Sequence, residues 1–339
     1  MPPILTLDTG MSNRLKIAVV DDSYRLLDTH QEHIAPENLQ GKIIQEVKRS
    51  ELERLAIAST WFLSENGLEG FVEKEGKKVS YINLPEIFKE TKETGLREFA
   101  MYNDAEATAL ALNVPHQEKV IQAGHPEEAE IKTLVYLGTG FQLVRSQYHH
   151  DLKRYLPEYG GGLMAAVPMN LLDNLVSFEF LNEVAEKAGL KSMSQLRHTH
   201  LLSVRGLSYI HAAASPLVDE GTKEQKDAAT LISEKEQQGR HQRTFTTYST
   251  ILGRCLQNFA STAGFNQALY LGGTFATAIA PHLDQQALRE AFAVPQHLTR
   301  KAYEEIPIIV LDEPFAGNLG AAYGLQNEIG TSAGIPYHE

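Results

Sequence analysis

The chain has 339 residues, 42% of them hydrophobic and 22% charged, which is the composition of a globular protein long enough for two domains. Its formal net charge of −12 leaves no general positive potential to hold a polyanion, so nucleic acid is not expected as a partner and a small ligand is. The single cysteine, Cys255, excludes an internal disulfide and a Cys-rich zinc cluster and suits a reducing compartment. We expect it in the core.

The beginning of the chain carries no signal for export or membrane insertion. Met1-Pro2-Pro3 leads directly into the strand-like run 4–7, without the basic flank and apolar stretch of a signal peptide. No later segment approaches the about 20 apolar residues that span a bilayer. We therefore expect a cytoplasmic protein with no membrane partner.

The first half of the chain predicts a hairpin, two buried strands and a helix. Strand-like runs at 4–7 and 15–20 flank a turn-rich segment and predict a hairpin with a polar tip. Next we expect a buried strand at 55–59, a charged connection at 73–78, a buried strand at 98–102 and an alanine-rich helix at 105–113. The second buried strand meets this helix at Asp104, and α/β proteins commonly place chemistry at such junctions.

The second half begins by repeating the opening arrangement. A strand at 133–137, the turn Gly138-Thr139-Gly140 and a returning strand at 141–146 predict another hairpin. Further on we expect helices near 171–188, 206–214, 222–240 and 248–263, a strand at 268–271, a helix from 275, a strand at 307–311 and a last helix after 317. The repeated hairpin indicates two α/β lobes, of which the second, with its inserted helices, is larger.

Three glycine-containing turns, each after a strand, are candidates for holding phosphate. In the turn Asp8 to Asn13, Gly10 lets the backbone approach an anion, and Asp8 is suited to hold Mg²⁺ through water. Gly138-Thr139-Gly140 offers backbone amides and a hydroxyl, and Gly272-Gly273 precedes a helix start. Each turn alone is more often an ordinary loop, whereas three such turns in this order are less easily explained in that way.

Asp104 has two interpretations. A carboxylate at the end of a buried strand can accept a proton from a hydroxyl that attacks a γ-phosphoryl group. Aspartate is also a good helix N-cap, and the local sequence favours that role at least as much.

Taken together, these segments resemble bacterial glucokinases and the related ROK sugar kinases from about residue 4 to residue 325. Asp8-Thr9-Gly10-Met11-Ser12-Asn13-Arg14 is similar to their D-x-G-G-T-N-x-R phosphate loop, and Tyr102-Asn103-Asp104-Ala105-Glu106-Ala107 to their catalytic N-D segment. Other matching segments are Asn83-Leu84-Pro85 (an N-L-P motif), Leu137 to Gly140 (the second phosphate loop), Leu271-Gly272-Gly273 (the adenosine-side G-G) and Ile306 to Gly324 (the closing strand and helix).

The resemblance implies a two-lobed actin/hexokinase-like, ribonuclease H-like α/β fold of mixed sheets flanked by helices. The small lobe would comprise 1–112 plus 318–339 and the large lobe 113–317. The resemblance also implies Mg-ATP as cosubstrate and the 6-hydroxyl of glucose or a related hexose as acceptor. It allows a homodimer, and because the chain has no Cys cluster, no zinc is expected. Asp104 would be the catalytic base and Asp8 would lie near Mg²⁺. The sugar contacts would be Asn83, Asn103, Asp104 and Glu158, and the nucleotide contacts Asp8, Gly10, Ser12, Asn13, Gly138, Thr139, Gly140, Gly272 and Gly273.

The sugar-gripping residues depart from the family pattern. Where the family has G-E-G-G-H, this chain has Tyr159 in place of the glutamate and Gly162 in place of the histidine, although a shift by one residue would bring Glu158 into register. Thr199 replaces a second sugar-binding glutamate, with His198 and His200 beside it as weak candidates. In the phosphate loops, Met11 replaces a glycine and Gln142 a small residue. These changes affect sugar specificity more than nucleotide binding, because each unmatched hydroxyl keeps its desolvation cost.

Three hypotheses follow. The first is a hexose kinase with Asp104 as base. The second is a weakened or inactive sugar and nucleotide sensor on the same scaffold, which the altered loop at Tyr159 and Gly162 favours. The third is an ATPase that acts on no sugar, which rests on the shared fold alone.

Overall fold

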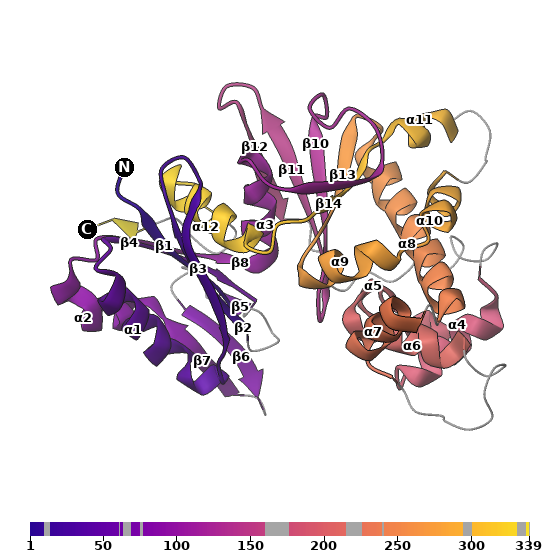
Figure 1. Ribbon diagram of the computed structural model, residues 1–339, viewed down its shortest axis with the longest axis horizontal. Helices are drawn as coiled ribbons and strands as arrows, with labels where there is room; N and C mark the ends of the chain where they lie inside the picture. The colour runs from indigo at the N-terminus through magenta and orange to yellow at the C-terminus, as the bar shows by residue number, and fades with distance from the viewer. Residues whose placement is uncertain are drawn as a thin grey trace. The chain divides into compact units, whose positions relative to one another are not determined.

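The computed structural model describes residues 1–9, 14–60, 62–63, 69–74, 77–159, 176–214, 226–238, 241–293, 300–330 and 337–338. These residues form two six-stranded mixed sheets flanked by helices (Figure 1), and the expected α/β fold is confirmed. The chain divides into two compact units. The first unit contains Met1–Gln117, Tyr148–Tyr159 and Glu313–Glu339, and the second contains Glu118–Gln147 and Gly160–Asp312.

The first sheet has the strand order β15-β8-β4-β1-β2-β3. Its strands are β1 (Ile4–Thr9), β2 (Arg14–Val20), β3 (Leu26–His33), β4 (Arg54–Ser59), β8 (Glu98–Asn103) and β15 (Tyr337–His338). The predicted hairpin is the antiparallel pair β1–β2, while β1, β4 and β8 run parallel. Every residue of β1 and β4 is buried, which explains why these strands read as continuous apolar runs.

The first unit also contains further helices, one strand of the second sheet and a small separate sheet. They are α1 (Leu39–Ser50), α2 (Leu84–Thr91), α3 (Asp104–Leu110), β12 (Arg154–Tyr159), α12 (Ala316–Gln326) and a small sheet of β5 (Phe62–Leu63), β6 (Glu69–Lys74) and β7 (Lys77–Asn83). The 3₁₀ turns are Pro36–Asn38, Lys92–Thr94 and Ala111–Asn113. Helix α1 buries Leu39, Ile43 and Val47 in one cluster with strand residues such as Ile17 and Leu55.

Residues 73–74 and 77–78 of the charged segment belong to strands rather than to a plain connection. Glu73 pairs with Lys78 and Lys74 with Lys77, which continues the ladder between β6 and β7. The expectation of a connection was therefore wrong at both ends. Charged residues in facing strand positions conceal a strand when apolar alternation is the signal that is sought.

The second sheet has the strand order β12-β11-β10-β13-β14-β9. Its other strands are β9 (Glu118–Gln122), β10 (Ile131–Leu137), β11 (Phe141–His149), β13 (Gln267–Gly272) and β14 (Ile308–Leu311). Strands β10 and β11 form the predicted antiparallel hairpin, and β10, β13 and β14 run parallel. The predicted strands of the second half are thus all present, extended by a few residues at most.

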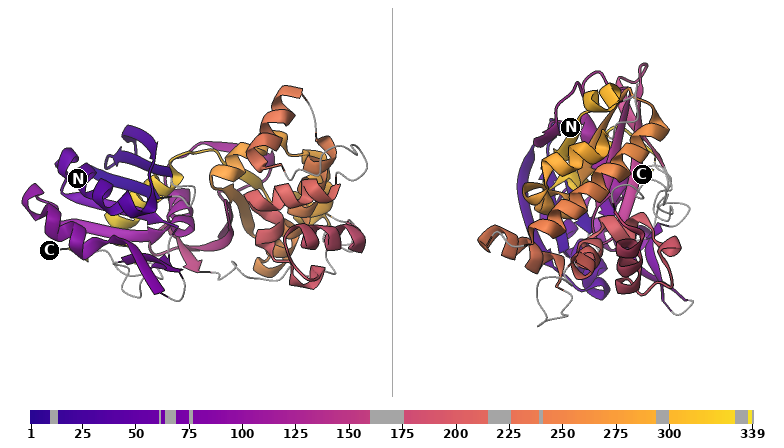
Figure 2. Two further views of the ribbon diagram at one scale, coloured as in Figure 1. Left: turned by 90° about the horizontal axis from the view of Figure 1, so that it is seen from below. Right: turned by 90° about the vertical axis from the view of Figure 1, so that its right-hand side faces the viewer.

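Helices account for the larger share of the second unit. They are α4 (Phe178–Lys187), α5 (His198–Leu202), α6 (Val204–Ala214), α7 (Ala228–Gln238), α8 (Gln242–Ala263), α9 (Thr274–Ile279), α10 (Gln285–Phe292) and α11 (Arg300–Glu305), with 3₁₀ turns at Met193–Gln195 and Ala280–His282. Helices α4, α5, α7 and α8 all contact α6, and Figure 2 shows this helical group from two further sides. Helix α8 continues past the group to contact β13.

The core of the second unit lies between these helices and one face of the second sheet. Val135, Leu137 and Phe141 from the sheet share a cluster with Leu256 and Phe259 of α8. Cys255 is buried in the same cluster, as expected, and its burial raises the pKa of its thiol to about 12. Within the described residues, no helix combines the length and apolar character that a bilayer crossing requires.

Candidate active site

The carboxyl ends of three parallel strands bring the predicted acidic residues of the first unit to one edge of its sheet. Thr9 of β1 is in register with Ser59 of β4, and Ser59 with Asn103 of β8. Asp8 lies one residue before this row and Asp104 directly after it. Because neighbouring strands are about 4.8 Å apart, the ends of β1 and β8 are separated by two such spacings, or about 10 Å. Asp8 and Asp104 thus lie at the same edge of the sheet, with β4 between their strands.

The junction between β8 and α3 shows which residue caps the helix. Asn103 is the N-cap: its Oδ1 accepts a hydrogen bond from the Ala105 N–H at 3.1 Å. Asp104 is the first residue of the helix, and its Oδ1 accepts from the same N–H at 2.9 Å. Asp104 is 2% exposed. The capping role therefore belongs to Asn103, and the Asp104 carboxylate is held in one orientation at the strand end.

Asp8 lies beside a cation and beside the first turn of α12. Lys16 is directly opposite Asp8 on β2, and its Nζ is 3.5 Å from Asp8 Oδ2. A Cβ added to Gly317 would come within 2.9 Å of the same oxygen, so the approach of α12 to the carboxylate requires glycine. Carboxylate oxygens are ligands that Mg²⁺ accepts, directly or through water. Asp8 fits a contact to Mg²⁺, with Lys16 as a competing positive charge.

The other predicted sugar contacts of the first unit are Asn83 and Glu158. Asn83 is the last residue of β7. Its Oδ1 accepts from the Glu86 N–H at 3.0 Å and so caps α2, while its own N–H donates to Gln40 Oε1 at 2.9 Å. Glu158 is exposed near the end of β12. The structure thus gives Asn83 a structural role in addition to any contact with a ligand.

Asn113 is a residue at this site that the sequence reasoning missed. Its Nδ2 donates to the Tyr155 carbonyl at 2.9 Å and its Oδ1 accepts from the Tyr155 N–H at 2.7 Å. Helix α3 itself also contacts β12. Asp104 and Asn113 therefore lie at opposite ends of one helical segment, and Asn113 fixes the strand that carries Glu158. No local motif signals such a pair, because the two residues are 42 positions apart.

In the second unit, two glycine turns lie next to each other. The turn Gly138-Thr139-Gly140 is closed by a hydrogen bond from the Gly138 N–H to the Gly140 carbonyl at 3.1 Å. The Val204 N–H donates to the Gly138 carbonyl at 2.9 Å, which fixes the turn to the start of α6. Gly273 has φ +95°, and a Cβ there would collide with the Leu137 carbonyl, directly before the first turn. Both turns are at the carboxyl ends of parallel strands, where backbone amides can receive phosphate.

Several predicted residues fall outside the described part of the chain. These are Gly10, Ser12 and Asn13 of the first phosphate loop, together with Met11, and Gly162 of the altered sugar loop. Their roles stay predictions.

His198 and His200, the two histidines beside Thr199, have structural roles. His198 is 3% exposed and its ring lies 5.3 Å from that of Phe141 and 5.1 Å from that of Phe259, so it packs as an aromatic core residue. His200 Nδ1 accepts from the Arg197 N–H at 2.9 Å. Burial, and then the nearby charge of Arg197, lower the pKa of His200, so its ring is neutral near pH 7. Thr199 lies between them, partly exposed.

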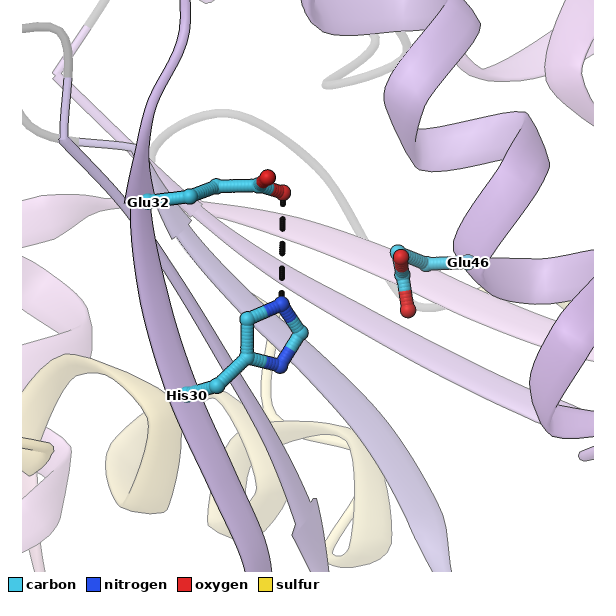
Figure 3. A group of neighbouring side chains, drawn as sticks. All are labelled: His30, Glu32 and Glu46. Atoms are coloured by element: carbon cyan, nitrogen blue, oxygen red, sulfur yellow. Dashed lines mark ion pairs between the residues drawn. The ribbon is translucent and has the colours of Figure 1, made fainter.

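His30, Glu32 and Glu46 of the first unit are close enough together to bind a metal ion, but they belong to an ion-pair network. His30 and Glu32 project from β3 toward Glu46 of α1 (Figure 3), with His30 Nε2 3.9 Å from Glu32 Oε1. Lys42 Nζ, however, is 2.9 Å from Glu32 Oε1 and 2.8 Å from Glu46 Oε1. The hydrogen bond to Glu46 is the main cause of the raised pKa of Lys42. An ammonium group thus already bridges the two carboxylates and ties β3 to α1.

Comparison with known families gives a match over most of the chain. The family model described as Glucokinase matches residues 38–328. The glucokinase of Pectobacterium atrosepticum is 25% identical over 244 residues, which are 70% of this chain and 72% of that protein. The glucokinase of Cupriavidus pinatubonensis is 26% identical over 254 residues, which are 72% of this chain and 68% of that protein.

Solved structures show the same fold over nearly the whole chain. A glucokinase from an Antarctic psychrotroph has a TM-score of 0.71 at 19% identity and covers 96% of this chain and 99% of its own. A glucokinase from Balamuthia mandrillaris in complex with glucose has a TM-score of 0.70 at 16% identity, covering 96% and 94%. A ROK family glucokinase from Streptomyces griseus in complex with glucose and AMPPNP has a TM-score of 0.58 at 14% identity, covering 96% and 99%.

Proposed function

The chain belongs to the glucokinase family, and on this premise we propose that it is an ATP-dependent hexose kinase. It transfers the γ-phosphoryl group of Mg-ATP to the 6-hydroxyl of glucose or a related hexose. The observation that carries this proposal is the position of Asp104. This buried carboxylate directly follows a strand parallel to the one that bears Asp8, and the family match covers it.

In the proposed reaction Asp104 accepts the proton of the attacking sugar hydroxyl. Phosphoryl transfer depends mainly on positioning and electrostatics, so the base needs a fixed orientation more than an unusual basicity. The Ala105 N–H supplies that orientation by donating to Asp104 Oδ1. The Asn103 amide contacts the sugar from the neighbouring position. Closure of the two lobes would exclude water from the transferred group.

Mg-ATP is the proposed phosphoryl donor. The backbone of Gly138-Thr139-Gly140 and of Gly272-Gly273 would receive its phosphates and adenosine side, together with Gly10, Ser12 and Asn13. Mg²⁺, when bound, supplies charge neutralisation at the phosphates, and Asp8 would contact it through water. The adjacent glycine turns at the ends of β10 and β13 support this assignment.

The identity of the sugar depends on contacts that differ from the family pattern. Asn83, Asn103 and Glu158 are the proposed partners of sugar hydroxyls. Tyr159 and Gly162 replace a glutamate and a histidine of the motif, so a hexose other than glucose, including an amino sugar, is within the proposal. A cytoplasmic location suits an ATP-dependent enzyme with one cysteine, and the family resemblance favours a homodimer.

The test is ADP production from Mg-ATP with a panel of hexoses, amino sugars and a control without sugar, for the natural protein and for Asp104→Asn. We expect turnover with one or a few sugars and its loss by several orders of magnitude in the variant. Unchanged turnover in Asp104→Asn would remove Asp104 from the role of base. ADP release without sugar would indicate an ATPase.

A second candidate is a sugar and nucleotide sensor, which the substitutions at Tyr159 and Gly162 favour. It predicts calorimetric binding of sugar or nucleotide with no turnover across the panel. The two functions are therefore separated by the same set of ligands.

A further inference from the structure

Lys16 is the resident counter-ion of Asp8. The two residues face each other across β1 and β2, with Lys16 Nζ 3.5 Å from Asp8 Oδ2. Both side chains are largely withdrawn from solvent, at 14% and 11% exposure. A pair this shielded is screened by salt much less than a surface ion pair, so its charges act strongly on any third charge nearby.

The Lys16 ammonium is fixed from a second side. Its Nζ donates to the Pro314 carbonyl at 2.6 Å, just before α12 begins. The backbone of Lys16 is held as well, because Asn318 Nδ2 donates to the Lys16 carbonyl at 3.3 Å and to Thr6 Oγ1 at 3.1 Å. The ammonium therefore cannot swing away from Asp8 without breaking the contact with the segment that precedes α12.

This arrangement opposes a divalent cation at Asp8. A cation that approaches the carboxylate meets the positive ammonium and also the first turn of α12, whose N-terminal end carries a partial positive charge. We propose that Lys16 weakens the hold of Asp8 on a divalent metal, so that the metal enters with the nucleotide rather than binding beforehand. The inference rests on the proposed function in one respect, which is that the metal concerned is the Mg²⁺ of Mg-ATP.

A purely structural role for Lys16 is the alternative. In that case the ammonium only joins the β1–β2 hairpin to the start of α12, and its removal lowers stability without changing metal affinity. The two roles separate when charge and hydrogen bonding are removed independently. Lys16→Met removes both, Lys16→Gln removes the charge but keeps a donor for the Pro314 carbonyl, and Lys16→Arg keeps the charge.

The experiment is Mn²⁺ binding to the nucleotide-free protein, followed by the loss of the free Mn²⁺ signal in electron paramagnetic resonance. We expect Lys16→Met and Lys16→Gln to bind Mn²⁺ about tenfold or more tightly than the natural protein. Lys16→Arg should bind like the natural protein, and Asp8→Asn added to Lys16→Gln should abolish the gain. Circular dichroism of each variant checks folding. If Lys16→Met does not fold, the Mn²⁺ affinity of Lys16→Gln provides the test.

Equal Mn²⁺ affinity in the natural protein and Lys16→Gln would overturn the proposal, as would a gain that survives Asp8→Asn. The outcome is distinguishable from that of the kinase assay, because no nucleotide or sugar is present. If no sugar is phosphorylated but the Mn²⁺ difference appears, the proposed function fails and the inference about Lys16 stands.

Discussion

Asn103 and Asp104 both accept a hydrogen bond from the Ala105 N–H, but their side chains do so from different positions in the backbone. Asn103 accepts the hydrogen bond in extended backbone conformation and begins the helix, whereas Asp104 accepts it from within the first turn. The N-cap of the helix is Asn103. A substitution that keeps a capping side chain at position 103 therefore tests the sugar contact separately from the helix start.

Asn103→Asp is expected to preserve stability, because aspartate caps helices as well as asparagine does. It removes the amide donor offered to the sugar, so we predict a rise in the KM for sugar with an unchanged melting temperature. Asn103→Ala should in addition lose about 1 kcal/mol of unfolding free energy. Steady-state kinetics and urea denaturation measure the two effects. A KM that is the same in Asn103→Asp and the natural protein would contradict the assigned contact.

At the scale of elements, glycine sets the distance between α12 and α3. A Cβ added to Gly320 would overlap the Ala107 carbonyl, and one added to Gly324 would meet the Tyr102 ring at 2.6 Å. The backbone of α12 therefore lies directly against α3 at Gly320 and against Tyr102 of β8 at Gly324. Because α3 begins at Asp104, this packing also holds the position of the carboxylate that we propose as the base.

Gly320→Ala is predicted to lower the unfolding free energy by at least about 3 kcal/mol, since the colliding atom is backbone and cannot rotate away. Gly41 in α1 is the matched control, because a Cβ there would meet nothing within 4 Å. Gly41→Ala should be neutral or stabilising by up to about 1 kcal/mol. Urea denaturation of both variants provides the comparison, and equal stability would show that α12 can shift freely.

Asn113 links the 3₁₀ turn Ala111–Asn113 to β12, and kinetic measurements can test this link. Its amide is hydrogen-bonded to both the N–H and the carbonyl of Tyr155, so Asn113→Ala weakens the hold on β12, which carries Glu158. We predict a rise of about tenfold in the KM for sugar, equivalent to ~1.4 kcal/mol, with the KM for ATP unchanged. Asn38, whose side chain makes no capping hydrogen bond, is the control as Asn38→Ala. Equal changes in both KM values would indicate general loosening instead.

The elements that the sequence predicts well are those with one dominant local signal. The hairpins β1–β2 and β10–β11 read directly from apolar runs around polar turns, and α8 from its long periodic pattern. Helix α1 was not recognised although Leu39, Ile43 and Val47 repeat at helical spacing, because polar residues and Gly41 dilute the pattern. The edge strand β3 has exposed polar residues over most of its length, so hydrophobicity does not reveal it.

The candidate site divides in the same way. Asp8, Asp104 and the glycine turns are recognisable because short motifs carry them. Lys16 and Asn113 are not, since each acts through a partner that only the fold brings near, namely Asp8 across a hairpin and Tyr155 across the chain. Motif reading therefore finds the groups that we propose to contact ligands and misses the groups that pack against them.

At the scale of the whole molecule, the free energy of unfolding depends on pH through two side chains of the second unit, His211 and Glu234. Burial is the main cause that lowers the pKa of His211 to about 4, helped by His241, whose ring lies 4.7 Å away. Hydrogen bonds, first from Lys226 and then from His241, lower the pKa of Glu234 to about 2. The unfolded chain binds more protons than the folded chain at pH values between each lowered pKa and its ordinary value.

Stability is therefore predicted to fall in two ranges as the pH decreases. The contribution of neutral His211 is complete above pH 6.5 and is lost as the pH falls toward about 4, and that of Glu234 is complete above pH 4.5 and is lost toward about 2. His211→Gln keeps a polar group next to Thr244 Oγ1 but does not titrate. Urea midpoints between pH 4 and pH 7 should change less steeply in this variant. Parallel curves for the two proteins would contradict the assignment to His211.

The measurement that bears most directly on the central claim is transfer of label from γ-³²P-ATP to the sugar that gives turnover, for the natural protein and Asp104→Asn. The account predicts labelled sugar 6-phosphate, with the phosphorylated carbon identified by NMR, and its loss in Asp104→Asn while ATP and sugar still bind. Label found only in inorganic phosphate, or no transfer although both ligands bind, would contradict a hexose kinase with Asp104 as its base.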